Sequence, residues 1–332
     1  MTLKVTDEEF VEIWNRLREP RKIALHFDLD IRSVHSRRKS IETRLGIILP
    51  SKNTKKNTSN IKNIQRSMSE QASEKRARVY QKEINETLVD GIIMVASDAH
   101  YWPGIVSIAH QAFCKLIKEL KPQIVVLNGD ILDGARISRH ARIMWEPQPK
   151  LKDELHAVQD RCAEIERAAG SAQLIRSIGN HDARFETMMS SSVPEIEELP
   201  GSTLFDYLPN WRASWVIHIN PITDGWLSIR HRPVSGGIHA SYNSTLRAGV
   251  SYVHGHLHKL QVTPWSDYRG RRYGVDTGTL AEPCGPQFNY TEAGPVNWTS
   301  GFAVLTFVSG KLLQPELCVV EHGKAWFRGK EV

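Results

Sequence analysis

The pattern of apolar and polar positions divides the chain into two regions. From residue 90 onward, short apolar runs typical of buried strands alternate with longer stretches whose apolar residues recur at helical spacing. The strand-like runs are 91–97, 123–129, 173–179, 226–231 and 250–255. Helical stripes lie between them, as in residues 105–120 and 151–165. Strands that alternate with helices indicate an α/β domain.

The first 50 residues instead predict three short helices. Thr6, followed three residues later by Glu9, forms a capping box just before an apolar stripe. Pro20 begins a second helix, and Asp30 caps a third. The third helix is expected to expose its basic side chains and to bury Val34, Ile41 and Leu45.

Two short helices joined by a tight turn, the second of them basic, are the arrangement of a helix-turn-helix. Residues 20–46 resemble the helix-turn-helix domains of regulators and recombinases. A plain three-helix bundle with a charged outer face would give the same pattern, so that alternative stays open. In the first interpretation the DNA-binding residues are Arg32, Arg37, Arg38, Lys39 and Arg44.

Positive charge is concentrated at the start of the chain. Residues 1–89 hold 19 Lys and Arg against 12 Asp and Glu, whereas residues 90–332 hold 24 against 25. Such an asymmetry favours an arm that binds a polyanion such as DNA, although a solvated linker with spare lysines is the alternative.

The segment after the three helices has the composition of a linker. Residues 51–78 contain no aromatic side chain and are rich in Ser, Asn, Thr and Lys, so they cannot bury enough apolar surface to fold alone. We therefore expect a helix-turn-helix-like domain over 1–50, a basic flexible linker over 51–88 and a catalytic domain over 89–332. A short helix is expected within residues 71–87.

Composition excludes several classes of protein. No window approaches the roughly 18 consecutive apolar residues of a membrane helix, and the N-terminus lacks the pattern of a secretory signal. The four cysteines are widely spaced and form no CxxC pair, which favours reduced thiols in a cytosolic protein. We expect a cytoplasmic location and no membrane partner.

Polar motifs follow each of the five strand-like runs. They contain, in order, Asp98 and His100; Asp130 and Asp133; Asn180, His181 and Asp182; His231; and His256 and His258. Side chains just past the carboxyl ends of strands converge on one crevice in α/β folds. Carboxylate, imidazole and amide ligands suit manganese, iron or zinc and exclude a thiolate site. One Asp-x-His alone would be read as a surface turn, but five such segments in order indicate a metal site.

This set of motifs resembles the calcineurin-like metallophosphoesterase superfamily over about residues 90–310. The resemblance implies an α/β fold in which a sandwich of two β-sheets is flanked by helices and carries two divalent metal ions side by side. Manganese is expected, with iron, zinc, nickel or magnesium as alternatives. Residues 276–280 and 297–302 are similar to phage- and prophage-encoded members, which would place the protein in the host cytoplasm.

The same resemblance implies a role for each motif. One metal ion would be held by Asp98, His100 and His258, the other by Asn180, His231 and His256, and Asp130 would bridge both. We prefer His231 to His218 and His239 because it directly follows a strand-like run. His181 would protonate the leaving oxygen or steady the transition state, Asp182 would orient His181, and Asp133 would lie behind the ligands.

Basic and aromatic side chains near these motifs are candidates for substrate contacts. Arg136, Arg139, His140 and Arg184 follow two of the motifs and suit a phosphate or nucleic-acid backbone, with solvated surface as the alternative. Trp211, Trp215, Trp226 and Trp298 could stack on bases, although packing in the core is the more common use of tryptophan.

These observations leave three functions open. The first is a metal-dependent DNA nuclease, or phosphodiesterase, that uses a metal-activated water and is directed to DNA by its N-terminal domain. The second is a nucleotide phosphodiesterase or phosphoprotein phosphatase whose N-terminal domain assembles a homo-oligomer. The third is a DNA-binding regulator with an inactive esterase domain. The complete ligand set argues against the third, and the basic N-terminal quarter favours DNA.

Overall fold

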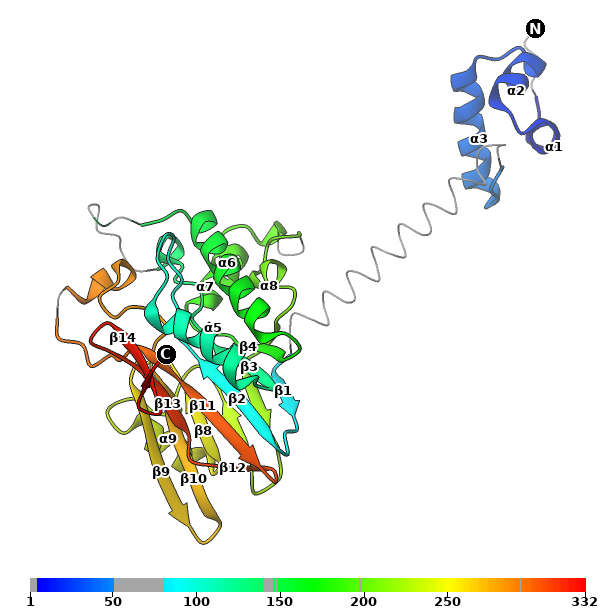
Figure 1. The fold of residues 1–332 in the computed structure, drawn as a ribbon. Coiled ribbons are helices and arrows are strands. Elements are labelled where there is room, and N and C mark those ends of the chain that lie inside the picture. Colours follow the sequence, from blue (N-terminus) through cyan, green and yellow to red (C-terminus); the bar gives the residue numbers. More distant parts are fainter. Residues whose placement is uncertain (1–4, 51–80, 140–145, 147, 197–198, 293) are drawn as a thin grey trace. The chain divides into compact units, whose positions relative to one another are not determined.

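The computed structural model describes residues 5–50, 81–139, 146, 148–196, 199–292 and 294–332 (Figure 1). The chain falls into two compact units, Met1–Arg76 and Ala77–Val332. Among the described residues, no helix is long and apolar enough to span a membrane.

The N-terminal unit contains the three expected helices, α1 (Asp7–Leu17), α2 (Pro20–Phe27) and α3 (Ile31–Leu45). The Thr6 side chain caps α1 by accepting from the Glu9 backbone N–H, and the Asp30 carboxylate caps α3. The unit has its own small core, built mainly from Phe10, Trp14, Ile23, Val34, Ile41 and Leu49. The three-helix prediction is confirmed.

The predicted burial of Leu45 is wrong, since this side chain is 52% exposed. Helix α3 ends at this residue, and Gly46 follows it in the left-handed conformation. The chain then folds back so that Leu49 is buried instead. A helical stripe extended to the last residue of a helix cannot anticipate such a reversal.

Three of the predicted DNA-binding arginines contact their own domain. The guanidinium groups of Arg37 and Arg38 lie over core aromatic rings, 5.5 and 4.8 Å from the ring centroids. Arg37 and Arg44 both form ion pairs with Asp7, and Arg38 pairs with Glu42. The expected exposure is therefore wrong for Arg37 and Arg38, which are half-buried, whereas DNA binding by the five residues stays a prediction. Those that stay exposed with no ion pair among the described residues are Arg32 and Lys39.

The second unit contains two β-sheets. The larger is nine-stranded, in the order β15-β14-β13-β11-β2-β3-β4-β5 with β12 beside β11. Its strands are β2 (Gly91–Ala96), β3 (Ile124–Asn128), β4 (Gln173–Ser177), β5 (Arg212–Ser214), β11 (Gly301–Val308), β12 (Lys311–Leu312), β13 (Glu316–Glu321), β14 (Lys324–Phe327) and β15 (Lys330–Glu331). Strands β2, β3, β4 and β5 are parallel neighbours.

The smaller sheet is six-stranded, in the order β1-β6-β7-β8-β10-β9. Its strands are β1 (Glu83–Glu86), β6 (Val216–Ile219), β7 (Leu227–Ile229), β8 (Ser251–His254), β9 (Leu260–Asp267) and β10 (Gly270–Thr277). All five strand-like runs of the sequence are strands, and they divide between the sheets: β2, β3 and β4 in the larger, β7 and β8 in the smaller.

Alternation along the central strands builds two layers of hydrophobic core. Ile93 and Val95 of β2 face the smaller sheet, whereas Met94 and Ala96 face the helices, because successive strand residues point to opposite sides. The helices on that outer face are α5 (Ile108–Leu120), α6 (Leu151–Ala169), α7 (Asp182–Ser192) and the short α8 (Leu204–Tyr207), as Figure 1 shows. Helix α9 (Ala240–Ala248) packs against β8, β9 and β10. The predicted sandwich of two sheets flanked by helices is confirmed.

The catalytic unit begins earlier than residue 89. Strand β1 pairs with β6, and both Ile84 and Leu88 are buried in this unit. The end of the predicted linker therefore belongs to the folded sheet, and the helix expected over 71–87 is wrong for residues 83–86. The rest of the predicted linker, residues 51–80, lies outside the described residues.

Candidate metal centre

The five motifs follow the carboxyl ends of strands in two sheets and meet at one site. Strands β2, β3 and β4 are parallel neighbours in one sheet, and β7 and β8 are parallel neighbours in the other. Parallel strands end on the same edge, so the loops that follow them lie together. Contacts between Asp98 after β2 and His258 after β8 show that the two edges meet here.

The backbone at this edge adopts conformations that non-glycine residues rarely take. Positive φ angles between 39° and 71° occur at Asp98, His100, Asp130, His256 and His258. Such strain persists only where the surrounding structure enforces it, and it clusters at functional sites. All five are candidate ligands.

Close packing around the ligands also requires glycine at two positions. Gly129 has a φ of +81°, and a Cβ there would lie 2.6 Å from Nδ1 of His231. A Cβ on Gly179 would overlap the carboxylate of Asp130. The glycines in the second and third motifs are thus needed so that the loops can approach the ligands.

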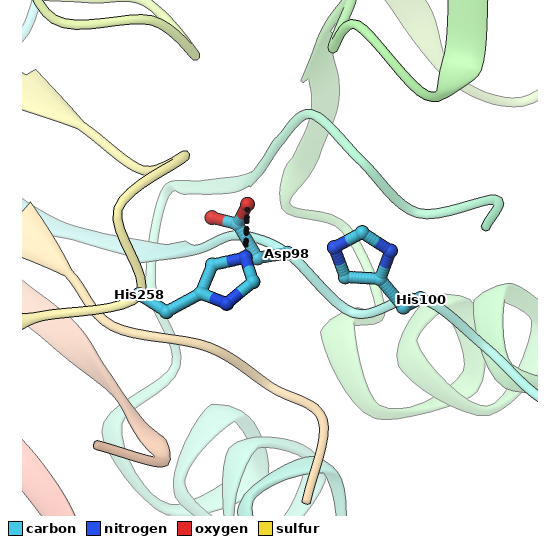
Figure 2. Close-up of side chains that lie close together, drawn as sticks. All are labelled: Asp98, His100 and His258. Atoms are coloured by element: carbon cyan, nitrogen blue, oxygen red, sulfur yellow. Dashed lines mark hydrogen bonds and ion pairs between the residues drawn. The ribbon is translucent and has the colours of Figure 1, made fainter. Parts of the chain in front are cut away.

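Asp98, His100 and His258 form the first cluster, in which potential ligand atoms lie within 4.8 Å of one another (Figure 2). Nε2 of His258 is 3.1 Å from a carboxylate oxygen of Asp98, whose other oxygen accepts the His256 backbone N–H. His100 bonds through Nδ1 to Asp133, and its buried Nε2 has no hydrogen-bond partner in the described part of the chain. An imidazole held through one nitrogen keeps the other for a metal ion.

Asp130, His231 and His256 form the second cluster. Nε2 of His231 lies 3.0 Å from the Asp130 carboxylate and 3.2 Å from the Asn180 side-chain oxygen. Nδ1 of His231 donates to the Asn128 carbonyl at 2.8 Å, which holds the ring with Nε2 toward the cluster. The structure therefore brings together every ligand predicted for the second metal ion. The bridging role of Asp130 stays a prediction.

The two competing histidines lie elsewhere. His218 is on β6, where its Nδ1 accepts from the indole N–H of Trp226. His239 is exposed at the start of α9. The structure brings only His231 of these three to the candidate ligands among the described residues.

The charges of the centre call for a cation. Burial alone would raise the pKa of Asp98, but the positive charges of His258 and His231 lower it to about 2. Burial alone would lower the pKa of His231, yet the charges of Asp130 and Asp98 raise it to about 10. The buried carboxylates are thus balanced by a proton on His231. A divalent ion would bring two positive charges to the same place once His231 has lost its proton, and oxygen and nitrogen donors suit such ions.

This balance predicts that metal uptake releases protons. Near pH 8 the metal-free protein carries a proton on His231, whereas His256, whose pKa burial and His231 lower to about 4, is already neutral. Binding through Nε2 requires a neutral ring, so we expect about one proton released per protein and tighter binding as the pH rises toward 10. Titration calorimetry with Mn²⁺ in buffers of different ionisation enthalpy measures this release. Binding without proton release would contradict the assignment of His231 as a ligand.

His181 is oriented by Asp133 rather than by Asp182. Nδ1 of His181 lies 2.9 Å from the Asp133 carbonyl and 3.3 Å from its carboxylate. Burial alone would lower the pKa of His181, but the hydrogen bond to the Asp133 carboxylate helps to raise it. The Asp182 carboxylate instead accepts backbone N–H groups of residues 130–132 and 179. The predicted role of Asp182 is therefore wrong: it holds the backbone of two motif loops.

The four predicted substrate-binding residues have different surroundings. Arg184 donates to the Asp133 carbonyl at 2.9 Å, and its other terminal nitrogen lies 3.0 Å from Nε2 of His181. Arg136 is turned toward the carbonyl of Gln148, and Arg139 is exposed. His140 lies outside the described residues.

Two cavities flank the centre and share Asn180 and Arg184. The first, of about 530 Å³, is lined by His181 and by residues that the sequence analysis missed, among them Trp102, Gln287 and Tyr290. Trp102 lies in the loop after the first motif, and Gln287 and Tyr290 lie in the 3-10 helix Pro286–Thr291. None of them belongs to a motif, so no local signal marks them. The second cavity, of about 580 Å³, is lined by Trp215 and several arginines as well as by Asn180.

Comparisons with known proteins agree with this geometry. Residues 92–260, a little over half of the chain, match the profile of the calcineurin-like phosphoesterase family. The chain is 28% identical over 225 residues to the Gene 54 protein of Mycobacterium phage L5, covering 63% of this chain and 86% of that protein. The Gene 54 protein of Mycobacterium phage D29 is 26% identical over 231 residues, covering 64% and 88%. The predicted similarity to phage-encoded proteins is confirmed.

Solved structures with a similar arrangement are more distant. Zinc-complexed Vps29 from Entamoeba histolytica is 15% identical, with a TM-score of 0.41, covering 72% of this chain and 98% of that one. A dimetal phosphatase from Danio rerio is 12% identical, with a TM-score of 0.36, covering 73% and 97%.

Proposed function

This chain belongs to the calcineurin-like phosphoesterase family, and from that premise we propose that it hydrolyses phosphodiester bonds of DNA. The family and the candidate His/Asp centre support a metal-dependent hydrolase. DNA as the substrate is the further step, and it depends on the N-terminal unit.

The roles proposed for individual residues follow from the contacts. Asp98, His100 and His258 would hold one divalent ion, and Asn180, His231 and His256 the other, with Asp130 between them. Bound divalent ions, for which we propose manganese, supply positive charge to the phosphoryl oxygens and acidify the attacking water.

His181 would transfer a proton to the leaving oxygen. Its raised pKa favours the protonated ring, and its side chain lines the 530 Å³ cavity. Asp133 keeps Nδ1 engaged, so Nε2 is the nitrogen that delivers the proton. Arg184 lies 3.0 Å from that nitrogen, and because two donors repel each other, protonation of Nε2 would leave Arg184 to a substrate phosphate.

The observation that favours DNA is the outer face of α3. Arg32 and Lys39 are exposed there without ion pairs among the described residues, and Lys39 borders a shallow hollow with the hydroxyl side chains of Ser36, Ser40 and Thr43. Cationic and hydroxyl groups are the usual partners of DNA phosphates. The second helix of a helix-turn-helix is the one that enters the major groove.

One assay tests the proposal directly. Purified protein with Mn²⁺ is offered linear duplex DNA, circular single-stranded DNA, bis-p-nitrophenyl phosphate, a mononucleotide and a phosphopeptide in parallel. We expect hydrolysis of DNA and of the chromogenic diester. Hydrolysis of the mononucleotide or phosphopeptide, with DNA left intact, would favour the nucleotide or phosphoprotein substrate. The N-terminal unit would then serve assembly into a homo-oligomer.

Removing the exposed charges of α3 is expected to weaken DNA binding. The double variant Arg32→Ala/Lys39→Ala should lower duplex affinity at low salt and reduce the slope of log K against log[salt] by about 2, since each phosphate contact contributes about 0.9. Turnover of bis-p-nitrophenyl phosphate should not change. Fluorescence anisotropy over a salt series measures the effect.

The control for this prediction removes the same charge from the catalytic unit. Lys311 and Lys330 are exposed on β12 and β15, and the variant Lys311→Ala/Lys330→Ala should keep the slope of the unchanged protein. Equal slopes for both double variants would remove the N-terminal unit from DNA recognition.

A further inference from the structure

We propose that the 580 Å³ cavity beside the metal centre binds unpaired nucleotides, with a base stacked on Trp215 and the phosphates held by arginines. This inference rests on the proposed function, because it presupposes a nucleic-acid substrate. It also implies that the nucleotides next to the cleaved bond must be unpaired where the nucleic acid enters the cavity.

The cavity is built from segments that the topology brings to one edge. Arg139 comes from the loop after the second motif, and Trp215 lies between β5 and β6. Helix α7 contributes Ala183, Arg184, Thr187, Met188 and Ser191. Arg230 and Arg232 flank the candidate ligand His231. Asn180 lines the cavity and lies 3.2 Å from Nε2 of His231, so the cavity opens directly onto the candidate metal centre.

The lining is positively charged. Four arginines, Arg139, Arg184, Arg230 and Arg232, line the cavity, and no acidic side chain does among the described residues. None of these four arginines forms an ion pair with another described residue, whereas Arg161, Arg212 and Arg272 elsewhere in the unit do. Guanidinium groups without carboxylate partners, gathered beside a phosphoesterase centre, are suited to successive phosphates of a strand.

The neighbouring cavity has a different charge. It is lined by the carboxylates Asp133 and Glu146 as well as by His181 and Arg184. Two cavities of similar size therefore meet at the centre, and only the second has a lining without acids. This difference places the backbone of the bound strand in the second cavity.

Trp215 supplies the second, independent observation. Its side chain is 49% exposed, whereas Trp211 is buried and bonds through its indole N–H to Glu166. Trp226 and Trp298 are half-buried and contact His218 and His258. Trp215 is thus the exposed tryptophan of this set, and it lines the cavity together with the arginines.

The position of Trp215 makes it a firm platform. It is the single residue between strand β5, which ends at Ser214, and strand β6, which begins at Val216. Each strand is paired in a different sheet, so the backbone on both sides of Trp215 is fixed. An aromatic ring held in this way loses little freedom when a base stacks on it.

A single strand fits these features better than a duplex. Bases in a duplex are already stacked and paired, so their faces are closed to a side chain, whereas unpaired bases stack on aromatic rings. A volume of 580 Å³ falls within the range of about 300–1,000 Å³ found for small-ligand pockets, which suits individual nucleotides. Arginines alone would accept any phosphate; the open indole ring selects for a base.

The test measures binding in the absence of cleavage. Full-length protein in the Arg32→Ala/Lys39→Ala background is titrated with fluorescent oligothymidylate and with a duplex of equal length, in EDTA. Trp215→Ala should weaken oligothymidylate binding by about tenfold, because base stacking on an aromatic side chain contributes roughly 1–3 kcal/mol. Trp215→Phe should restore most of the affinity, and duplex binding should not change.

Two further variants serve as controls. Tyr268→Ala removes a fully exposed ring at the turn between β9 and β10, and it should leave oligothymidylate binding unaltered. Arg139→Ala should lower the salt slope for oligothymidylate by about 0.7, the contribution of one phosphate contact on a single strand. Far-UV circular dichroism and the metal content of Trp215→Ala report whether the fold and the centre are intact.

The outcomes separate this inference from the proposed function. If the protein cleaves DNA but Trp215→Ala binds oligothymidylate as tightly as its parent, the cavity proposal is overturned and the nuclease proposal stands. If the parent cleaves the chromogenic diester but neither binds nor cleaves any DNA, the proposed function fails and this inference fails with it. Equal weakening of duplex and single-strand binding by Trp215→Ala would also overturn the cavity proposal.

Discussion

Replacing Asp130 with asparagine is expected to lower the turnover of bis-p-nitrophenyl phosphate by more than about 10³-fold. Loss of one electrostatic group from an active site typically costs about 10²–10³-fold, and Asp130 serves two proposed metal sites at once. Its carboxylate also accepts the His181 backbone N–H at 2.8 Å and lies 3.0 Å from His231. An amide of the same shape keeps the packing but removes the charge.

Metal content should fall together with turnover in this variant. Elemental analysis of protein purified in Mn²⁺ measures the first, and the rate of p-nitrophenolate release measures the second. Asp160→Asn is the matched control, since this carboxylate is exposed on α6 away from the motifs. An Asp130→Asn protein with the metal content and turnover of its parent would falsify the bridging assignment.

Replacing His181 with alanine should lower kcat by about 10²–10⁴-fold, which is the usual contribution of a positioned acid or base. Metal content should stay as in the parent, because His181 is assigned to the leaving oxygen. The nearby Asp133 carboxylate would lose its contact to His181 but would keep its hydrogen bond to His100. The fold should therefore be retained.

The pH profile distinguishes a catalytic from a merely structural role. If His181 donates a proton, the alkaline limb of kcat against pH in the parent should disappear in His181→Ala. His156→Ala removes an exposed histidine of α6 and should leave both rate and profile unchanged. Loss of one metal ion on substitution would instead move His181 into the ligand set, alongside His100 and Asp133, with which it forms a third close group.

Much of the candidate centre could be predicted from local sequence patterns. Strand runs and the polar residues after them are contiguous in sequence, so the five motifs and their strands could be predicted without coordinates. Helix caps are equally local, since Thr6 and Asp30 act within three residues of themselves. These features depend on neighbouring residues alone, and the structure contains them where they were expected.

Roles that depend on distant contacts could not be predicted in this way. The family resemblance implied that Asp182 orients His181, yet the contact to Nδ1 of the ring comes from Asp133, 48 residues earlier. Arg37 and Arg38 were expected to be exposed on the outer face of the third helix, yet their guanidinium groups lie over aromatic rings of the core. A sequence pattern shows whether a side chain is polar, charged or apolar, but not which residue it contacts.

What the sequence by itself determined is the type of fold, the ligand chemistry and the order of the motifs. Only the tertiary structure decided that the motifs come from two different sheets, that Trp215 is open while Trp211 is buried, and that four arginines line one cavity. The physical reason is the separation along the chain of the residues that interact. Strand and helix periodicity arises from the geometry of consecutive residues. Exposure and charge pairing arise when distant segments pack together, as Asp98 and His258 do across 160 positions.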